Sequence, residues 1–236
     1  RSYIKKKYFK MKKKFFKNLI VNKPWGYEYL IYNNKKLAIT LLNINYMQKT
    51  SLHCHSKKKT GFILLSGTTE INLGFYNRES FSAPSKTMIR PGLFHSTRAL
   101  SQNGAQILEL ETPIDKDDLI RFEDKYGRLK ENYQGKSKIE KINDSHVIFK
   151  EPKINQPNTY DFNGVEVKLE KFKDFKQLNK KSYDTIIAVL DGGIRCKKTK
   201  KMVLTPGEVI KTGTVQKLSE VFEIKNKNSI TTLSVK

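Results

Sequence analysis

From Lys23 onward the sequence is a regular succession of short apolar runs, and this spacing is the feature that most constrains the fold. The runs are rich in Ile, Leu, Val, Phe and Tyr, and clusters of Gly, Asn, Asp, Pro or Ser separate them about every eight to twelve residues. Such spacing predicts short strands in an all-β sandwich or barrel. The expected strands lie at residues 27–32, 37–45, 61–65, 68–73, 87–89 and 105–110, and then at 165–169, 185–190, 202–204 and 229–235.

Composition divides the chain into four segments. Residues 1–22 are basic with aromatic residues between the lysines, so we expect a flexible N-terminal segment or, alternatively, a short basic helix lying on a membrane or nucleic acid. Met11 resembles a natural start, which would make the ten residues before it extra sequence. A first barrel is predicted at 23–132, a connector rich in turn residues at 133–160 and a second barrel at 161–236. A short helix is expected at 119–122.

The two halves contain similar turns. Residues 63–68 resemble residues 187–193, each an apolar run that ends in a glycine turn. Residues 88–92 likewise resemble residues 203–207, each an apolar run followed by Pro-Gly. The pattern predicts a duplicated barrel, and chance similarity within a β-rich chain is the alternative.

The net charge of +23 invites a nucleic-acid-binding interpretation, but the composition argues against it. Only seven of the 46 basic residues are arginines, the residue type best suited to phosphate and base recognition, and the chain is also rich in Asn and Ile. A generic lysine-coated surface is therefore expected. No apolar run approaches the roughly eighteen residues of a membrane span, and the two cysteines are far apart, so we expect neither a span nor a disulfide framework, and a cytoplasmic location.

Three of the four histidines fall in an arrangement that suggests a metal site. His53 and His55 flank Cys54, and the period of two along a strand would place both imidazoles on one face and the thiol on the other. His95 follows the Pro91-Gly92 turn, which can bring a third imidazole across a barrel to the same ion. The three histidines are the predicted ligands of a divalent metal.

These residues resemble the motifs of the cupin superfamily. His53, His55, position 60 and Gly67 have the spacing of the first motif, and Gly92 and His95 match the second. The resemblance implies a double-stranded β-helix (jelly-roll) fold, here with two barrels of which the second, lacking histidine, is degenerate and metal-free. It also implies edge-strand pairing into a homodimer. Thr60 stands where the family has a glutamate ligand, so the implied site has three histidines and positions open to water or substrate.

A narrower likeness concerns residues 23–130. The strings Lys23-Pro-Trp-Gly-Tyr-Glu, Ser66-Gly-Thr and residues 117–128 resemble the cupin-type mannose-6-phosphate isomerases and the mannose-1-phosphate guanylyltransferases fused to them. The likeness implies isomerase or epimerase action on a phosphorylated or nucleotide-linked sugar with a divalent Zn, Fe, Mn or Ni ion. Isomerisation needs a Lewis acid, a proton carrier and cations for the phosphate.

Candidate residues for these tasks follow from the same region. Glu109 and Glu111 share one strand face and are expected bases or substitute ligands. Arg121, Arg128 and Arg98 are candidates for the phosphate, although the segment from Arg121 to Arg128 could equally be a structural salt-bridge cap. Two other classes stay open: a three-histidine Fe(II) dioxygenase, and a sugar-binding or regulatory cupin without catalysis.

Overall fold

The computed structural model describes residues 18–129, 139–225 and 229–236, and strands dominate these ranges, as predicted. The first half contains β1 (Leu19–Lys23), β2 (Gly26–Asn33), β3 (Ala38–Ile44), β4 (Leu52–Cys54), β5 (Lys59–Ser66), β6 (Thr68–Leu73), β7 (Asn77–Ser82), β8 (Ser85–Ile89), β9 (His95–Ala99), β10 (Ala105–Thr112) and β11 (Ile120–Glu123). The rest contains β12 (Ile139–Lys141), β13 (Asn158–Phe162), β14 (Val165–Phe172), α2 (Lys176–Asn179), β15 (Ile186–Asp191), β16 (Ile194–Cys196), β17 (Met202–Leu204), β18 (Val209–Lys211), α3 (Thr212–Lys217), β19 (Phe222–Ile224) and β20 (Ile230–Val235).

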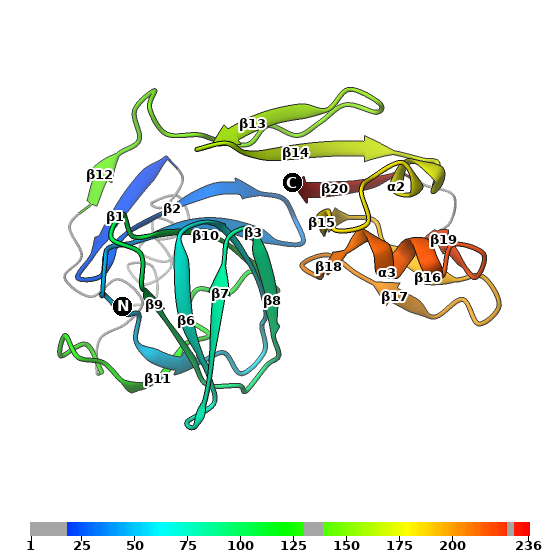
Figure 1. The fold of residues 1–236 in the computed structure, drawn as a ribbon. Helices are drawn as coiled ribbons and strands as arrows, with labels where there is room; N and C mark the ends of the chain where they lie inside the picture. Colours follow the sequence, from blue (N-terminus) through cyan, green and yellow to red (C-terminus); the bar gives the residue numbers. More distant parts are fainter. Residues whose placement is uncertain (1–17, 130–138, 226–228) are drawn as a thin grey trace, which may run out of the picture.

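The first half forms two antiparallel sheets that enclose a core (Figure 1). One has the order β12-β1-β2-β3-β10-β5-β8 and the other β11-β4-β9-β6-β7. Buried side chains from both sheets, such as Phe62 on β5 and Ile71 on β6, pack in one cluster between them. The order β3-β10-β5-β8 against β4-β9-β6-β7 is that of a jelly roll, so the predicted double-stranded β-helix is confirmed.

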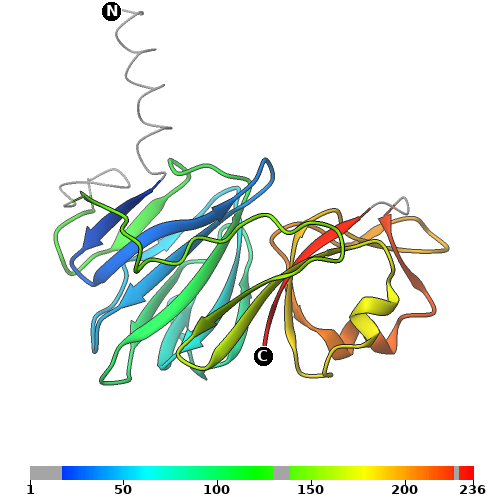
Figure 2. The same cartoon turned by 90° about the horizontal axis from the view of Figure 1, so that it is seen from above.

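Strands β5 and β10 are buried on both faces. Phe62 and Ile107 point into the first barrel, whereas their neighbours Ile63 and Leu108 belong to a second core cluster that includes Leu169 and other residues of the second half. Burial on both sides explains why these strands read as nearly continuous apolar runs. The first barrel and the second half thus lie side by side with β20 at their junction (Figure 2).

The second half repeats the strand order of the first. Its sheets run β13-β14-β20-β15-β18 and β17-β16-β19, which correspond in chain order to β2-β3-β10-β5-β8 and β7-β6-β9. The short helix α2 takes the place of β4, and α3 lies between β18 and β19. Strand β4, which carries His53 and leads directly to His55, therefore has no strand counterpart among the described residues of the second half, whereas β9, which carries His95, corresponds to β19. The division into two barrels at the predicted boundaries stays a prediction.

Three local expectations need correction or comment. The helix expected at 119–122 is wrong, because these residues enter β11, which pairs with β4. The proposed match of the two Pro-Gly turns is also wrong: Pro91-Gly92 joins β8 to β9, whereas Pro206-Gly207 joins β17 to β18. The predicted basic segment lies mostly outside the described residues, and its last part, from Leu19, belongs to β1.

The described part of the predicted connector contains β12, which pairs with β1. Within the described ranges, no helix has both the length and the apolar character needed to cross a bilayer.

Candidate metal centre

The three predicted ligands converge inside the first barrel. His53 on β4 is the cross-strand partner of His95 at the start of β9, and His55 follows β4 directly. The ring centroids lie 4.4 Å apart for His53 and His95, 5.1 Å for His53 and His55, and 5.5 Å for His55 and His95. One nitrogen from each ring lies within 4.8 Å of the others, which is close enough for a single ion.

Backbone carbonyls fix the orientation of all three rings. The Nδ1 atom of His53 lies 2.8 Å from the oxygen of Ser51, that of His55 lies 2.5 Å from the oxygen of Asp118, and that of His95 lies 3.1 Å from the oxygen of Leu93. A carbonyl can only accept, so each Nδ1 donates and each neutral ring keeps the lone pair on Nε2. This is how proteins orient histidine ligands of metals.

The atoms aimed into the cavity fit a divalent transition metal. His55 and His95 are 5% and 1% exposed, and their Nε2 atoms have no hydrogen-bond partner among the described residues. Buried nitrogens without partners are costly unless something binds them. Three neutral imidazole nitrogens are a donor set that suits Zn, Fe, Ni or Mn.

Electrostatics keeps the rings neutral. Burial lowers the pKa of His53 well below its ordinary value, and the neighbouring His95 and His55 lower it further. Burial and His55 lower the pKa of His95 to about 4. Burial and the Lys58 ammonium lower the pKa of His55. At neutral pH the site therefore offers lone pairs rather than protons to a cation.

Thr60 leaves the cavity without the glutamate of the family motif, but two carboxyl groups enter it from β10. Thr60 is fully buried, and its direct cross-strand partner on β10 is Glu111. Glu109 precedes Glu111 by one strand period, and both line the cavity with the histidines. His55, Glu109 and Glu111 form a second group whose ligand atoms all lie within 4.8 Å.

The two glutamates differ in their surroundings. Glu111 accepts from the Lys58 ammonium at 2.5 Å and from the Lys116 ammonium at 2.6 Å, and Lys58 is only 2% exposed. Burial would raise the pKa of Glu111, but Lys116 and Lys58 hold it below its ordinary value. Burial and the Glu111 carboxylate instead raise the pKa of Glu109 to about 8. No hydrogen bond or ion pair to Glu109 is found within the described ranges.

Cationic side chains surround the entrance to the cavity. Its volume is about 70 Å³, and it is lined by Lys23, Trp25, Glu28, Leu42, Thr50, Ser51, His53, His55, Lys58, Phe62, His95, Thr97, Glu109, Glu111, Lys116, Leu119, Arg121 and Arg128. Arg121 reaches it because β11 pairs with β4, where its cross-strand partner is His53. Arg98 does not line the cavity and pairs with Glu70 at 3.8 Å, so that phosphate candidate does not join the others.

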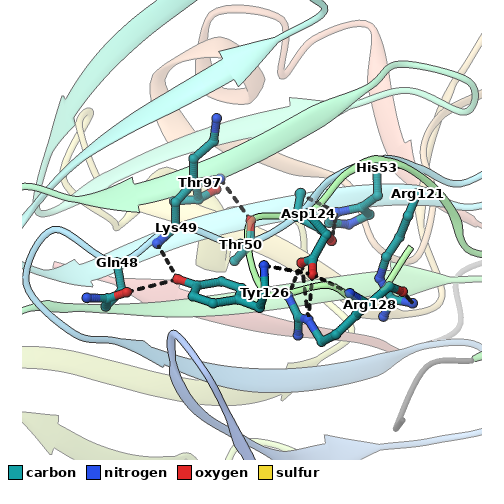
Figure 3. Close-up of polar contacts among 10 residues, drawn as sticks. Gln48, Lys49, Thr50, His53, Thr97, Arg121, Asp124, Tyr126 and Arg128 are labelled. Atoms are coloured by element: carbon teal, nitrogen blue, oxygen red, sulfur yellow. Dashed lines mark hydrogen bonds and ion pairs between the residues drawn. The ribbon is translucent and has the colours of Figure 1, made fainter. Parts of the chain in front are cut away.

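The segment after β11 is held by a compact polar network (Figure 3). Asp124 accepts from the backbone amides of Tyr126 and Arg128 and from the Arg128 guanidinium. The Tyr126 hydroxyl donates to Gln48 at 2.9 Å. Arg121 Nη1 lies 3.5 Å from the backbone oxygen of Arg128. Asp124 and Tyr126 thus act as the structural cap, and the two arginines still face the cavity.

Sequence reasoning missed Asp118. Its carboxylate accepts from the Ser56 amide and hydroxyl at 2.8 and 2.7 Å, and from the Lys57 and Lys58 amides at 3.0 Å. Burial would raise its pKa, but these hydrogen bonds hold it below the ordinary value. The only sequence signal is its place in the isomerase-like string, since no local pattern links it to residues sixty positions earlier.

Two other side chains take no part in the candidate metal site. Cys54 is buried, as strand alternation predicts for the face opposite the histidines, and is not among the candidate ligand groups. His146 packs edge-on against Tyr29 and does not line the cavity.

Comparisons with known proteins gave one family match and several similar solved structures. Residues 10–124 match the family described as "Mannose-6-phosphate isomerase C-terminal". Solved structures similar to the chain include a double-stranded β-helix protein from Klebsiella pneumoniae, with 13% identity over 41% of this chain and 84% of that chain and a TM-score of 0.38. KdgF from Halomonas has 15% identity over 40% of this chain and 86% of that chain, with a TM-score of 0.38. A cupin-2 domain protein from Shewanella frigidimarina has 20% identity over 44% of this chain and 91% of that chain, with a TM-score of 0.34.

No curated protein matches the chain. The resemblance predicted from the histidine motifs is confirmed by the family match and by the jelly-roll strand order. Residues 10–124 thus match the mannose-6-phosphate isomerase C-terminal family, and the first half of the chain has a cupin-type jelly-roll fold.

Proposed function

We propose that this cupin is a divalent-metal-dependent enzyme that isomerises or epimerises a phosphorylated or nucleotide-linked sugar. One observation carries the proposal: three imidazoles, each held through Nδ1 by a backbone carbonyl, keep a lone pair on Nε2 and line one cavity together with cationic side chains. His55 and His95 are buried, and His53 is partly buried. His53, His55 and His95 would hold the ion. When bound, it would polarise a sugar carbonyl or align two neighbouring hydroxyl groups.

The cations would hold the phosphate. Arg121 and Arg128 line the cavity. Of the two lysines that pair with Glu111, Lys116 is the more exposed, with 26% of its side chain accessible to solvent. Guanidinium groups match phosphate oxygens in a bidentate geometry. Five cationic side chains against three carboxyl groups line the cavity, and this excess of positive charge favours an anionic substrate over a neutral sugar.

Proton transfer between neighbouring carbons needs a side chain beside the ion. Glu109 and Glu111 are the carboxyl groups closest to the histidines, as judged from the ligand group that they form with His55. Both are therefore the candidates for this step, with Arg121 as the group that positions the substrate.

A second candidate function has one observation in its favour. Thr60 removes the charge-compensating glutamate of the family motif, and three histidines with open positions also suit Fe(II) and oxygen. A dioxygenase would consume oxygen with a sugar substrate, whereas an isomerase would not. A cupin that binds a sugar nucleotide without metal would be the non-enzymatic alternative. A homodimer and a cytoplasmic location stay predictions.

The proposal is tested on the purified full-length chain and on a His53→Ala, His95→Ala double variant. We expect close to one divalent ion per wild-type chain by elemental analysis and none in the variant. Wild-type protein should then interconvert an aldose and a ketose phosphate without consuming oxygen. Equal metal content in the two proteins would remove the proposed site. Oxygen uptake would favour the dioxygenase instead.

A further inference from the structure

The metal centre has a vacancy in its ligand set that the first-barrel motif does not fill. Thr60 stands at the position of the motif glutamate, is fully buried, and its Oγ1 has no hydrogen-bond partner among the described residues. A threonine hydroxyl is a poor replacement for a carboxylate next to a divalent cation. A carboxylate would have to come from another strand.

Strand β10 carries two carboxyl groups opposite Thr60 and its neighbour on the same face of β5. Glu111 is the direct cross-strand partner of Thr60, and Glu109 is the partner of Phe62, one strand period further along. Because Thr60 and Phe62 face into the first barrel, their partners on β10 face the same way. His55 contributes the second observation, since its Nε2 atom is buried and lacks a partner among the described residues. One of its two ring nitrogens lies within 4.8 Å of ligand atoms from both glutamates.

Ion pairing separates the two glutamates. Both oxygens of Glu111 are engaged, Oε1 by Lys58 at 2.5 Å and Oε2 by Lys116 at 2.6 Å. Lys58 is 2% exposed and cannot swing into water, so freeing Glu111 for an ion would leave a buried ammonium uncompensated. Glu109 differs from Glu111 in this respect, because no ion pair or hydrogen bond to Glu109 is found within the described ranges.

We propose that Glu109 replaces the missing motif glutamate and, with His53, His55 and His95, completes the ligand set of the metal. This assignment rests on the proposed metal site and deepens it. Glu111, held by Lys58 and Lys116, keeps its charge balanced and stays outside the coordination sphere. The carboxylate ligand has thus moved from β5 to the neighbouring strand β10 of the same sheet.

The test titrates the metal-free full-length chain with Co(II) and follows both affinity and the visible absorption of the bound ion. Glu109→Gln should weaken Co(II) binding at least 10- to 100-fold and change the absorption spectrum, because a ligand is lost. Glu111→Gln is the matched control and should keep the wild-type spectrum. Glu109→Asp keeps the charge but shortens the side chain, so it should shift the spectrum even if the affinity falls only a few-fold.

Rescue gives the sharpest outcome. Thr60→Glu in the Glu109→Gln background returns a carboxylate to the motif position and should restore affinity to within a few-fold of wild type. Wild-type affinity and spectrum in Glu109→Gln would overturn the assignment, and so would loss of binding in Glu111→Gln alone. These results differ from a failure of the proposed function, in which the wild-type chain itself binds no Co(II) or binds it equally in the His53→Ala, His95→Ala variant.

Discussion

The backbone oxygen of Asp118 accepts a hydrogen bond from His55 Nδ1 at 2.5 Å, and the Asp118 carboxylate accepts hydrogen bonds from the three residues that follow His55. Asp118 lies in the loop between β10 and β11, so a single residue of this loop orients the His55 ring and also the turn that leads from His55 into β5. The orientation of His55, one of the three proposed metal ligands, therefore depends on this long-range contact.

We expect Asp118→Ala to destabilise the fold by about 3 kcal/mol, because four donors lose an ionised acceptor that is itself buried. The backbone oxygen that accepts from His55 is kept in this variant, but the hydrogen bonds that position it are lost, so metal affinity should also fall about 10- to 100-fold. Urea unfolding and Co(II) titration measure the two effects. Asp144→Ala, at an exposed position, is the control and should change stability by less than about 0.5 kcal/mol. Unchanged affinity in Asp118→Ala would refute this role of Asp118.

Acid should weaken the same turn. The folded-state pKa of Asp118 lies below its ordinary value of about 3.9, so its contribution to stability is complete above pH 4 and is lost as the pH falls further. Wild-type stability, measured by urea unfolding at several pH values, should therefore drop below about pH 4. Asp118→Asn cannot titrate, so its stability should be lower at neutral pH and should fall less between pH 4 and 3. Parallel curves for the two proteins would contradict this account.

Metal release should require a pH well below the ordinary histidine range. The pKa of His95 is about 4 in the folded chain, so protons compete with a cation for its Nε2 only near that value. In the Glu109→Gln variant, whose remaining proposed ligands are the three histidines, Zn(II) affinity should stay nearly constant from pH 7.5 to about 5.5 and fall steeply below about pH 5. A hexahistidine peptide, with a histidine pKa near 6.5, should lose Zn(II) at higher pH and serves as the reference. Release of Zn(II) from this variant near pH 6.5 would show that the rings are not buried as described.

The Lys58 and Glu111 side chains should be energetically coupled. Lys58→Met leaves Glu111 with Lys116 as its ion-pair partner and should destabilise the chain by about 2–4 kcal/mol. Adding Glu111→Gln removes the buried charge, so the double variant should be more stable than the sum of the two single changes by more than about 1 kcal/mol. Urea unfolding of the four proteins measures the coupling. Simple additivity would mean that the pair contributes nothing beyond its separate members.

Arg121 should distinguish phosphorylated from neutral sugars. Arg121→Ala should weaken binding of a sugar phosphate about 10- to 100-fold, because a charge-assisted contact contributes about 1.5–3 kcal/mol. Binding of the corresponding neutral sugar and of Co(II) should not change. Arg98→Ala is the matched control, since Arg98 pairs with Glu70 and does not line the cavity. An equal loss for the neutral sugar would assign Arg121 a structural role only.

The histidine site could be predicted because its geometry is local. Strand alternation places His53 and His55 together, and the turn after β8 delivers His95 to the adjacent strand. The long-range contact of Asp118 and the ion pair of Lys58 with Glu111 could not be predicted, because each joins residues more than fifty positions apart. Their pairing depends on which strands become neighbours, and that information lies in the packing of the whole sheet.

The errors have a similar origin. Residues 119–122 have mixed polarity because β11 is an edge strand with one exposed face, and such a pattern over four residues does not separate strand from helix. The Pro-Gly dipeptides match as turns, yet one precedes β9 and the other precedes β18, because turn residues specify a bend and not its place in the topology. Similarly, the sequence of residues 176–179 does not predict that helix α2 stands here in place of β4, the strand that carries His53 in the first half.

Strands β5 and β10 have one face in the metal cavity and the other against the second half of the chain. Their outward side chains, Ile63, Leu65, Leu108 and Leu110, are almost inaccessible to water because Val167, Leu169 and Leu233 cover them. A fragment that ended before β13 would therefore expose these apolar side chains of β5 and β10 to solvent, on the side of the sheet opposite the cavity. Residues of the second half thus shield the apolar outer face of the two strands that carry Thr60 and Glu109.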